Sequence, residues 1–300
     1  MARDSRRDES GPESIGISIV DKAAGWTSHD VVARGRGTFG TRKVGHSGTL
    51  DPDATGVLLL GVGRATRLLR YLTDLPKTYT TTVVLGIETS TLDDSGEVTA
   101  THDMGHVSAE EIEEIAATFV GDIEQIPPMV SAIKIDGKRL YELAREGIEV
   151  EREPRPVTIH SLVVNAIDLA NLRFDIEVCC SSGTYIRTLA ADIGTKLGGG
   201  AHLTNLRRTK VGSFHADQGL PIETAELISP AEGLRDYEAV EVDESTARDV
   251  THGKVLLAEA LGVSGAGPWR VLDADGQMLA MYESHRGDTV KPAVVLVIAP

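Results

Sequence analysis

Residues 45–57 contain the side chains in this sequence that could do chemistry most directly. They read Gly-His-Ser-Gly-Thr-Leu-Asp-Pro-Asp-Ala-Thr-Gly-Val and place one carboxylate, Asp51, in a loop that glycines and a proline constrain on both sides. An aspartate held in such a loop can act as a nucleophile or can stabilise positive charge that develops on a substrate. Taken alone, an Asp-Pro pair is also an ordinary turn signal, and the hydrophobic run from Val57 would then be the buried strand that follows the turn.

Residues 51–55 also satisfy the Asp-x-Asp-x-Thr pattern of aspartate-nucleophile phosphatases, which bind Mg²⁺ through both carboxylates. Those enzymes need the first aspartate at the end of a buried strand. Residues 44–49 hold two glycines, a histidine and a serine, so no such strand is expected before Asp51. The phosphatase alternative is therefore disfavoured, because a short motif without its structural context matches often by chance.

The elements that must position Asp51 follow from hydrophobic periodicity and from helix-capping signals. Thr27 or Ser28 can cap a helix, and Ser108 with Glu111 forms a capping box that opens a helix to about residue 120. The other expected helices are 140–145 and 185–197, and the expected strands are 16–20, 57–60, 78–88, 130–135, 158–169, 173–181 and 206–214. Strands outnumber helices, which predicts a mixed α/β (α+β) fold with a large, mostly antiparallel sheet.

Composition divides the chain into three stretches. Residues 1–14 are polar and charged, without the apolar core of a signal peptide, and are expected to be a disordered leader. Residues 15–216 should form the main domain. Residues 239–300 hold short Val/Leu-rich segments separated by glycines, which predicts a small β-rich second domain. No apolar run approaches the roughly 18–20 residues that a membrane-spanning helix needs.

The two cysteines, Cys179 and Cys180, are adjacent in an apolar, strand-like run. Neighbouring cysteines rarely bond to each other, and no Cys/His pattern has the spacing of a zinc site. Buried thiols in a reducing compartment are therefore expected, which indicates a cytoplasmic protein without a bound metal.

The formal net charge of −15 would argue against a nucleic-acid partner if only the total mattered. The acidic excess is concentrated, however, because residues 217–300 hold 15 acidic and 6 basic residues. Phosphates are bound by local basic patches, whatever the total charge of the chain. Three such clusters occur elsewhere: Arg34, Arg36, Arg42 and Lys43; Lys134, Lys138 and Arg139; and Arg207, Arg208 and Lys210. Each alone is more often a solvated surface than a binding site.

The whole string around Asp51 resembles the catalytic motif of the TruB-type pseudouridine synthases, Gly-His-x-Gly-x-Leu-Asp-Pro-x-Ala-Thr-Gly-Val-Leu. Three further segments match that family in the same order. Residues 21–30 resemble its Lys-Pro-x-Gly-x-Thr-Ser motif, with Ala23 in place of the usual proline; residues 77–79 resemble its Lys-x-Tyr motif; and residues 182–189 resemble its Ser-Gly-Thr-Tyr-Ile-Arg motif. Residues 91–96, 125–132 and 206–209 also fit.

The resemblance assigns roles to individual residues. Asp51 would be the catalytic aspartate, and Arg187 would hold it ionised and oriented by charge-assisted hydrogen bonds. Tyr79 would stack on the target uracil, because a base taken out of its stack needs an aromatic wall. The remaining supporting residues would be Tyr185 and Leu206 as further walls, His46 in the space that the flipped nucleotide leaves, and Asp93.

The resemblance also implies a fold and a function. The fold would be that of the pseudouridine synthases with a small C-terminal PUA-like domain, and residues from about 124 to 156 would form a loop that clasps RNA. The reaction would convert uridine 55 in the T-loop of tRNA to pseudouridine by base flipping, without metal or organic cofactor. The expected RNA-binding residues are Lys22, Arg42, Lys134, Lys138, Arg139, Arg207, Arg208 and Lys210.

Several alternatives stay open at this level. The protein could be an RNA-binding folding factor for tRNA whose catalysis is dispensable. The guide-RNA-dependent branch of the family is disfavoured, because it carries extended basic tails and this chain ends in an acidic segment. A protein that acts alone on tRNA, as a monomer, is therefore expected. The residues do not distinguish attack by Asp51 at C1′ from attack at C6 or from a glycal route.

Overall fold

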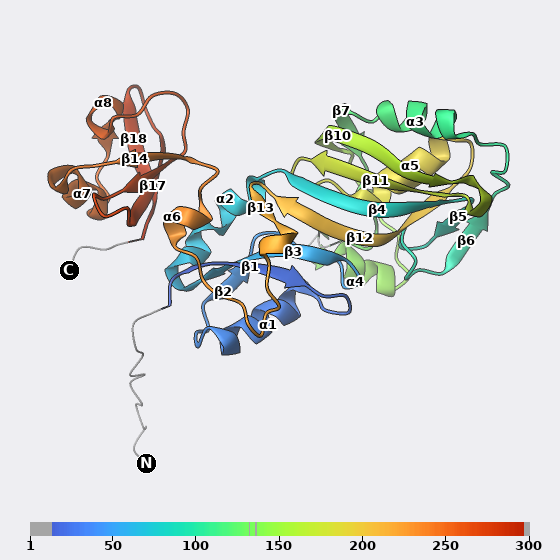
Figure 1. Cartoon of the computed structure of the whole chain (residues 1–300), viewed down its shortest axis with the longest axis horizontal. Coiled ribbons are helices and arrows are strands. Elements are labelled where there is room, and N and C mark those ends of the chain that lie inside the picture. The colour runs from blue at the N-terminus through green and yellow to red at the C-terminus, as the bar shows by residue number, and fades with distance from the viewer. Residues whose placement is uncertain (1–13, 132, 136, 297–300) are drawn as a thin grey trace, which may run out of the picture. The chain divides into compact units, whose positions relative to one another are not determined.

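The computed structural model describes residues 14–131, 133–135 and 137–296, and its contacts divide the chain into two compact units (Figure 1). Of the described residues, the first unit contains 14–51, 57–73 and 217–296, and the second contains 52–56 and 74–216. The chain passes from the first unit to the second directly after Asp51. The disordered leader expected at residues 1–14 lies, except for Ser14, outside the described residues.

The second unit is built on an antiparallel sheet with the strand order β12-β4-β11-β10-β7. Strand β12 pairs in parallel with the first two residues of β3. This arrangement confirms the expected large, mostly antiparallel sheet. The strands of this sheet are β4 (Lys77–Leu85), β7 (Gly121–Gln125), β10 (Arg155–Asp168), β11 (Arg173–Cys180), β12 (Ala201–Val211) and the short β13 (Phe214–His215). Two hairpins accompany it: β5 (Ile87–Thr89) with β6 (Val98–Thr101), and β8 (Lys134–Ile135) with β9 (Lys138–Arg139).

The two faces of this sheet differ in burial because side chains alternate along each strand. On β4, Tyr79 and Val83 are buried whereas Thr82 and Val84 are half-buried. Helix α5 (Ile186–Lys196) packs on β12 and contributes several fully buried aliphatic side chains. The other helices of the unit are α3 (Ala109–Ala117) and α4 (Leu140–Arg145). Helix α3 begins with the expected capping box, in which Ser108 and Glu111 bond to each other's backbone N–H.

The first unit holds the elements that lead into and out of the Asp51 loop. Helix α1 begins at Ser28 and is capped by Thr27, whose hydroxyl accepts from the backbone N–H of Asp30. The core beneath this helix contains Val31, Leu58 and Ile222, among others. The elements concerned are β1 (Gly16–Lys22), α1 (Ser28–Thr38), β2 (Val44–His46), β3 (Thr55–Val62), the 3-10 helix η1 (Gly63–Leu68) and α2 (Leu69–Asp74).

The C-terminal part of the first unit is a five-stranded sheet with the order β14-β16-β17-β18-β15. Its core includes the fully buried Trp269, Tyr282 and Val250. It confirms the expected small β-rich segment. Its elements, with the helices around it, are α6 (Pro230–Gly233), β14 (Glu238–Glu241), α7 (Glu244–Thr251), β15 (Leu256–Leu257), α8 (Ala258–Leu261), β16 (Trp269–Leu272), β17 (Met278–Ser284) and β18 (Thr289–Val295).

Two strand predictions were wrong in their extent. The strand expected at 130–135 is reduced to the two residues of β8, and Val130 gives its carbonyl to a side chain rather than to a neighbouring strand. The strand expected from residue 206 begins five residues earlier, at Ala201, because the chain enters β12 directly after the glycines that end α5. Within the described part of the chain, no helix is long and apolar enough to cross a membrane.

Candidate active site

The Asp51 loop connects β2 to β3, which pair as an antiparallel hairpin from Val44↔Val62 to His46↔Leu60. The residue before the aspartate is held by Ser28: the Ser28 hydroxyl accepts from Leu50 N–H at 2.9 Å and donates to the Leu50 carbonyl at 3.2 Å. Ser28 is buried at the start of α1. The 21–30 motif therefore supports the Asp51 loop through Ser28, which the sequence had offered only as a possible helix cap.

Gly56 fixes where the loop ends. Its φ is +104°, and a Cβ at this position would collide with the Arg208 backbone, including the nitrogen at 2.9 Å. Only glycine allows β3 to approach β12 this closely, with Thr55 opposite Arg207 and Gly56 opposite Arg208. Asp51 precedes Thr55 by four residues, so the chain itself keeps their Cα atoms within about 14 Å.

His46 lies at the start of the same loop and is half-buried. Its Nδ1 accepts a hydrogen bond from the Gly48 backbone N–H at 3.2 Å, which fixes the ring orientation. The exposed ring of His29 meets it edge-on, with centroids 5.4 Å apart and an interplanar angle of 82°. Helix α1 thus supports the histidine as well as the residue that precedes Asp51.

Arg187 lies in the first turn of α5 and is only 4% exposed. Its guanidinium donates to the Thr91 carbonyl at 2.9 Å and to the Val130 carbonyl at 2.8 Å. Its Nε lies 3.7 Å from Oδ2 of Asp93. The second unit therefore brings together two of the expected site residues, Arg187 and Asp93, and holds the guanidinium from two different loops.

Asp93 is itself fixed within its loop. Its Oδ1 accepts from the Thr91 hydroxyl at 2.6 Å, from the Ser95 hydroxyl at 2.5 Å and from the Ser95 backbone N–H at 3.1 Å. These three donors occupy one carboxylate oxygen and turn the other toward Arg187. The loop is thus arranged around the arginine by its own hydrogen bonds.

The start of α5 depends on Gln125 at the end of β7. Tyr185 occupies the N-cap position, but it makes no side-chain capping bond. The buried Gln125 amide takes that role: it accepts from Tyr185 N–H at 2.9 Å and donates to the Tyr185 carbonyl at 3.2 Å. Because Tyr185 precedes Arg187 by two residues, this amide orients both. The sequence motif contained Gln125, but its partner could not be read from the sequence.

Tyr79 lies on the buried face of β4, opposite Val178 of β11 and Arg208 of β12. On the same face, Lys77 is buried and donates to the Leu75 carbonyl at 2.6 Å. Burial, reinforced by the positive charge of Arg208, lowers the pKa of Lys77 to about 8. The tyrosine expected to stack on the base therefore has two buried cations as neighbours in the sheet, Lys77 on its own strand and Arg208 on the next.

Leu206 lies in a bulge of β12. The register between β12 and β4 shifts between Thr204 and Arg207, and Asn205 in this stretch has a φ of +56°. A bulge inserts an extra residue and redirects the side chains next to it. Leu206 is half-buried as a result, and neither the bulge nor its effect was expected from the sequence.

Two of the residues expected to bind RNA are buried. Lys22 is 1% exposed and donates to the carbonyls of Ala23 and Trp26, and Arg208 is 2% exposed. Neither presents its charge to solvent, so any role of Lys22 and Arg208 in RNA binding stays a prediction. Clustering in sequence does not show on which face of a strand or turn each charge lies.

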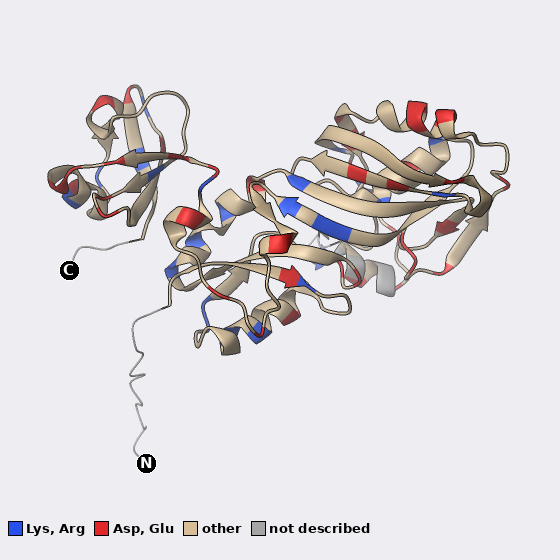
Figure 2. Cartoon of the chain, viewed as in Figure 1, with Lys and Arg blue, Asp and Glu red and all other residues tan. Residues whose placement is uncertain are grey.

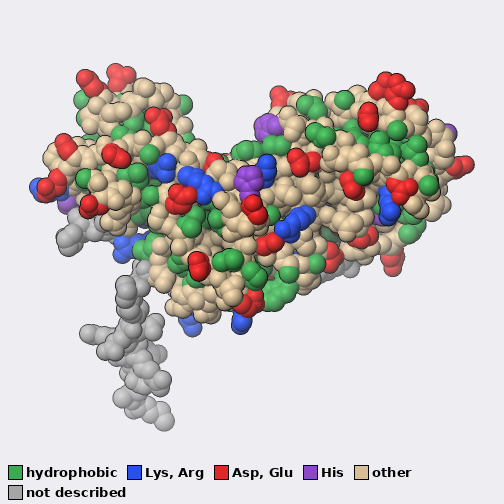
Figure 3. All heavy atoms as spheres, viewed as in Figure 1, with side chains coloured by type: hydrophobic (Ala, Val, Ile, Leu, Met, Phe, Trp, Pro, Cys, Tyr) green, Lys and Arg blue, Asp and Glu red, His purple; other side chains and the backbone are tan. Residues whose placement is uncertain are grey.

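The other expected RNA-binding residues differ in accessibility. Arg42 and Lys138 are exposed, and Lys138 pairs with Glu146 at 3.2 Å. Arg207 and Lys210 on β12 are half-buried. Residues Lys134 and Arg139 pair as backbone partners in the β8–β9 hairpin, and their side chains lie outside the described part. Acidic side chains are spread over the face drawn in Figure 3, and Lys and Arg form a few small groups there. In Figure 2, acidic residues mark helix α3.

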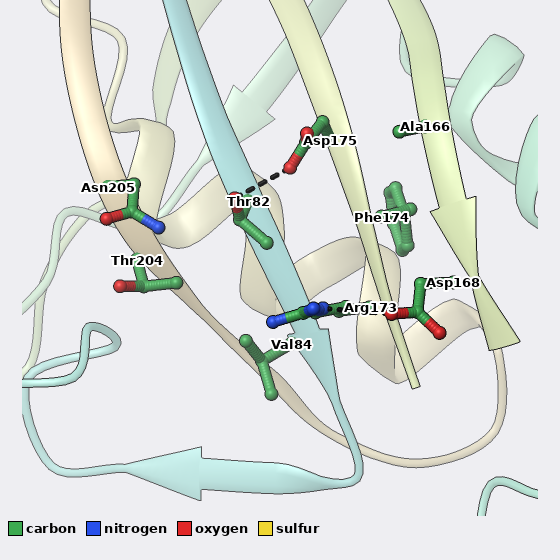
Figure 4. A pocket seen from close by; sticks show the side chains of 9 residues that line it. All are labelled: Thr82, Val84, Ala166, Asp168, Arg173, Phe174, Asp175, Thr204 and Asn205. Atoms are coloured by element: carbon green, nitrogen blue, oxygen red, sulfur yellow. Dashed lines mark hydrogen bonds and ion pairs between the residues drawn. The ribbon is translucent and has the colours of Figure 1, made fainter. Parts of the chain in front are cut away.

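A cavity of about 330 Å³ lies in the second unit, on the face of the sheet that carries Thr82 and Val84 (Figure 4). It is lined by Thr82, Val84, Ala166, Asp168, Arg173, Phe174, Asp175, Thr204 and Asn205. Since side chains alternate along β4, the Tyr79 ring points away from the face that carries Thr82 and Val84. The cavity is therefore separate from the Tyr79 surface.

The described residues contain no group of three or more His, Cys, Asp or Glu side chains placed to hold a metal ion. Both cysteines are free thiols, and Cys180 is buried. Burial raises the pKa of Cys180 to about 12, so this thiol stays protonated and is a poor nucleophile.

Comparisons with known families match almost the whole chain. Residues 36–186 match the TruB family pseudouridylate synthase N-terminal domain. Residues 187–234 match the tRNA pseudouridylate synthase B C-terminal domain, and residues 237–297 match the C-terminal domain of tRNA pseudouridine synthase II. All of the motifs quoted above from residue 36 onward fall within these segments.

Individual relatives agree with the family matches. The tRNA pseudouridine synthase B of Arthrobacter sp. is 45% identical, with 95% of this chain and 97% of the relative covered. That of Mycobacteroides abscessus is also 45% identical, with 94% and 96% covered. Among solved structures, a chain of a Cbf5-Nop10-Gar1 complex has a TM-score of 0.73 at 24% identity, covering 94% of this chain and 85% of that one. At that identity the structural similarity establishes the fold alone.

Proposed function

The chain belongs to the TruB family of pseudouridine synthases, and from that premise we propose how its own residues act on RNA. It is a tRNA pseudouridine synthase, an isomerase that converts uridine to pseudouridine in tRNA. We assign the target to uridine 55 in the T-loop, and this assignment rests entirely on the resemblance to the TruB-type enzymes, because no residue spacing in the chain encodes the position.

The reaction breaks the N1–C1′ bond of uridine, turns the uracil ring and joins C5 to C1′. The C5 proton is lost and N1 gains one, so no oxidant, reductant or external group is required. In our proposal the Asp51 carboxylate acts as nucleophile or stabilises positive charge on the ribose, and it must therefore be ionised. Arg187 donates to that carboxylate, which keeps it charged and oriented.

The observation that carries this proposal is the fixation of Arg187. A guanidinium held by the carbonyls of Thr91 and Val130, with Asp93 beside its Nε, cannot change direction without losing those contacts. A buried arginine has to be paired, because an unpaired buried charge is costly. Preorganised charge of this kind is what a transition state with developing charge requires.

The flipped uridine would stack on Tyr79, with Tyr185 and Leu206 as further walls of the pocket. Unstacking a base costs a few kcal/mol, and contact with an aromatic face offsets part of that cost. His46 would fill the space that the nucleotide leaves in the RNA loop. Its bond from Gly48 and its contact with His29 hold the ring ready for that role.

The RNA-binding surface in this proposal consists of basic side chains, together with the loop of residues 124–156 around the T-arm. The set is Arg42, Lys134, Lys138, Arg139, Arg207 and Lys210. The protein would act in the cytoplasm as a monomer and without a guide RNA, so the T-arm itself would supply the specificity.

Replacement of Asp51 by Asn tests this function. The amide has nearly the volume of the carboxylate but cannot be an anionic nucleophile. We expect pseudouridine formation on an unmodified tRNA transcript, detected by primer extension after carbodiimide treatment, to be abolished. Binding of the tRNA should change by no more than about 1–2 kcal/mol, the range of one altered polar contact.

Asp53→Asn is the matched control, since Asp53 is exposed in the same loop two residues later and should be dispensable. Near-normal turnover by Asp51→Asn would remove Asp51 from the chemistry and contradict the proposal. Growth of a deletion strain carrying the inactive variant would show separately whether the cell depends on RNA binding or on the modification.

A further inference from the structure

The loop of residues 89–96, which carries Asp93 and the Thr91 carbonyl, is fastened to strand β12. Its Leu92 carbonyl accepts from Leu203 N–H at 3.1 Å, and Asp93 forms a parallel bridge with Leu203. One residue further along both segments, the Thr204 hydroxyl donates to Oδ2 of Asp94 at 2.7 Å. The loop that holds Arg187 is thus tied to β12 by a backbone contact and a side-chain contact.

The side-chain contact between Thr204 and Asp94 lies where β12 changes its register with β4. Directly after Thr204, Asn205 adopts a φ of +56°, and the strand resumes its pairing with β4 at Arg207, opposite Thr80. Leu206 is therefore directed by the bulge that begins at Thr204. Thr204 thus contacts the loop that holds Arg187 and also directly precedes the bulge that carries Leu206.

We propose that Thr204 and Asp94 are positioning residues that set Arg187 and Leu206 relative to each other. This inference rests on the proposed roles of Arg187 and Leu206 in the reaction. The Thr204–Asp94 bond joins the loop that contacts Arg187 to the start of the bulge that carries Leu206, so its loss leaves the loop held to β12 by the Leu92–Leu203 contact. Small errors in geometry are expensive for catalysis, because reacting groups must be held close to the productive arrangement.

The interior of the 89–96 loop shows why its attachment to β12 matters. Asp93 binds Thr91 and Ser95 through Oδ1, so the loop is internally rigid. Leu92 has a φ of +63°, a conformation that costs energy in a residue with a side chain. A rigid, strained loop moves as a body, and its contacts with β12 at Leu203 and Thr204 oppose that movement.

The neighbouring strand supplies a matched control. Thr82 is the register partner of Thr204 and donates its hydroxyl to Oδ1 of Asp175 at 2.6 Å (Figure 4). Both are Thr–Asp hydrogen bonds between side chains, and Thr82, Asp175 and Thr204 line the same cavity, whereas Asp94 belongs to the 89–96 loop. Only the bond of Thr204 reaches the loop that holds Arg187, so the two bonds differ in position and not in type.

The experiment compares Thr204→Val with Thr82→Val in single-turnover pseudouridine formation at saturating tRNA. Each change removes one hydroxyl and keeps the side-chain shape. We expect Thr204→Val to lower the rate constant 3- to 10-fold with less than a twofold change in tRNA Kd, and Thr82→Val to stay within twofold of wild type in both. Thr204→Ser should recover most of the rate, because it restores the donor. Equal rates for the two valine variants would overturn the inference.

A double-mutant cycle tests whether Thr204 acts through Arg187. In an Arg187→Lys background, Thr204→Val should lower the residual rate by less than twofold, because the guanidinium contacts that it protects are already lost. A full 3- to 10-fold loss in that background would show that Thr204 acts elsewhere and would overturn the inference. The proposed function fails by a different result, which is activity retained by Asp51→Asn or by Arg187→Ala in the same assay.

Discussion

The hydroxyl of Ser28 is bonded to both the N–H and the carbonyl of Leu50, the residue that precedes Asp51. Ser28 is buried and is the first residue of α1, which Thr27 and Asp30 cap with a reciprocal pair of bonds. A rigid helix end therefore holds the catalytic loop by its backbone. The capping box and the aspartate motif are separated by some twenty residues in sequence but work as one structure.

Ser28→Ala should reduce both stability and activity. The two buried backbone groups of Leu50 lose their partner, which costs about 1–3 kcal/mol in the free energy of unfolding. The substitution should also lower kcat by a larger factor than it raises KM, because Asp51 in the freed loop would lose its orientation. Ser284→Ala is the control, because that exposed serine bonds to the Ala266 carbonyl in the C-terminal sheet. A Ser28→Ala enzyme with wild-type kcat would show that the loop does not need this support.

Local signals predicted the parts of the fold that depend on near neighbours. The capping box at Ser108 is confirmed, and of the two caps expected for the first helix, Thr27 or Ser28, the structure uses Thr27. A side chain and a backbone N–H three residues apart decide both. The glycines after α5 end that helix as expected, with Gly198 at a φ of +87°. The family resemblance predicted Asp51 and Arg187 as site residues, because the motifs that contain them occur in the chain in the order typical of the family.

Features that depend on distant partners could not be predicted in this way. The bulge at Asn205 exists because β12 must pair with β4 on both sides of it. Gln125 bonds to the backbone of Tyr185 at the start of α5 from 60 residues away, and no sequence pattern in either segment predicts that contact. Lys22 and Arg208 were expected to bind RNA, and no sequence pattern indicated that the fold buries both. Burial is a tertiary property, and a count of charges cannot supply it.

Arg187→Lys should retain only a small part of the wild-type rate, and Arg187→Ala should lose activity by orders of magnitude. A single ammonium cannot reproduce the planar guanidinium that reaches the carbonyls of Thr91 and Val130 together. Single-turnover rates on one tRNA transcript provide the measurement, with tRNA affinity measured in parallel. Full activity in the lysine variant would mean that the positive charge alone is sufficient and that the planar guanidinium is not required.

Neutralising Arg207 and Lys210 together should weaken tRNA binding and reduce its dependence on salt. Each phosphate contact that is lost should lower the slope of log affinity against log salt by roughly 0.7–0.9. Arg173→Gln is the control, because Arg173 is an exposed arginine of the same sheet that pairs with Asp168 at 3.3 Å. An unchanged slope in the Arg207→Gln/Lys210→Gln protein would move the binding surface to Arg42 or to the β8–β9 hairpin.

Lys77 should make stability depend on pH in the alkaline range. Its pKa in the folded protein is about 8, below the ordinary value of 10.5, because burial and then the charge of Arg208 disfavour the ammonium. Between these two values the unfolded chain binds a proton that the folded protein has released. The free energy of unfolding therefore rises with pH across this window, whereas below pH 8 the penalty of burying the charge is constant.

The comparison that isolates this effect is between wild type and Lys77→Met, which keeps the length of the side chain without its charge. We expect the free energy of unfolding of wild type to gain about 2 kcal/mol on that of the variant between pH 8 and pH 10. Tyr71 and Tyr282, whose pKa values burial raises to about 12, affect both proteins alike. Denaturant titrations at several pH values provide the measurement. A difference that stays constant over this range would mean that Lys77 titrates in the folded protein as it does in the unfolded chain.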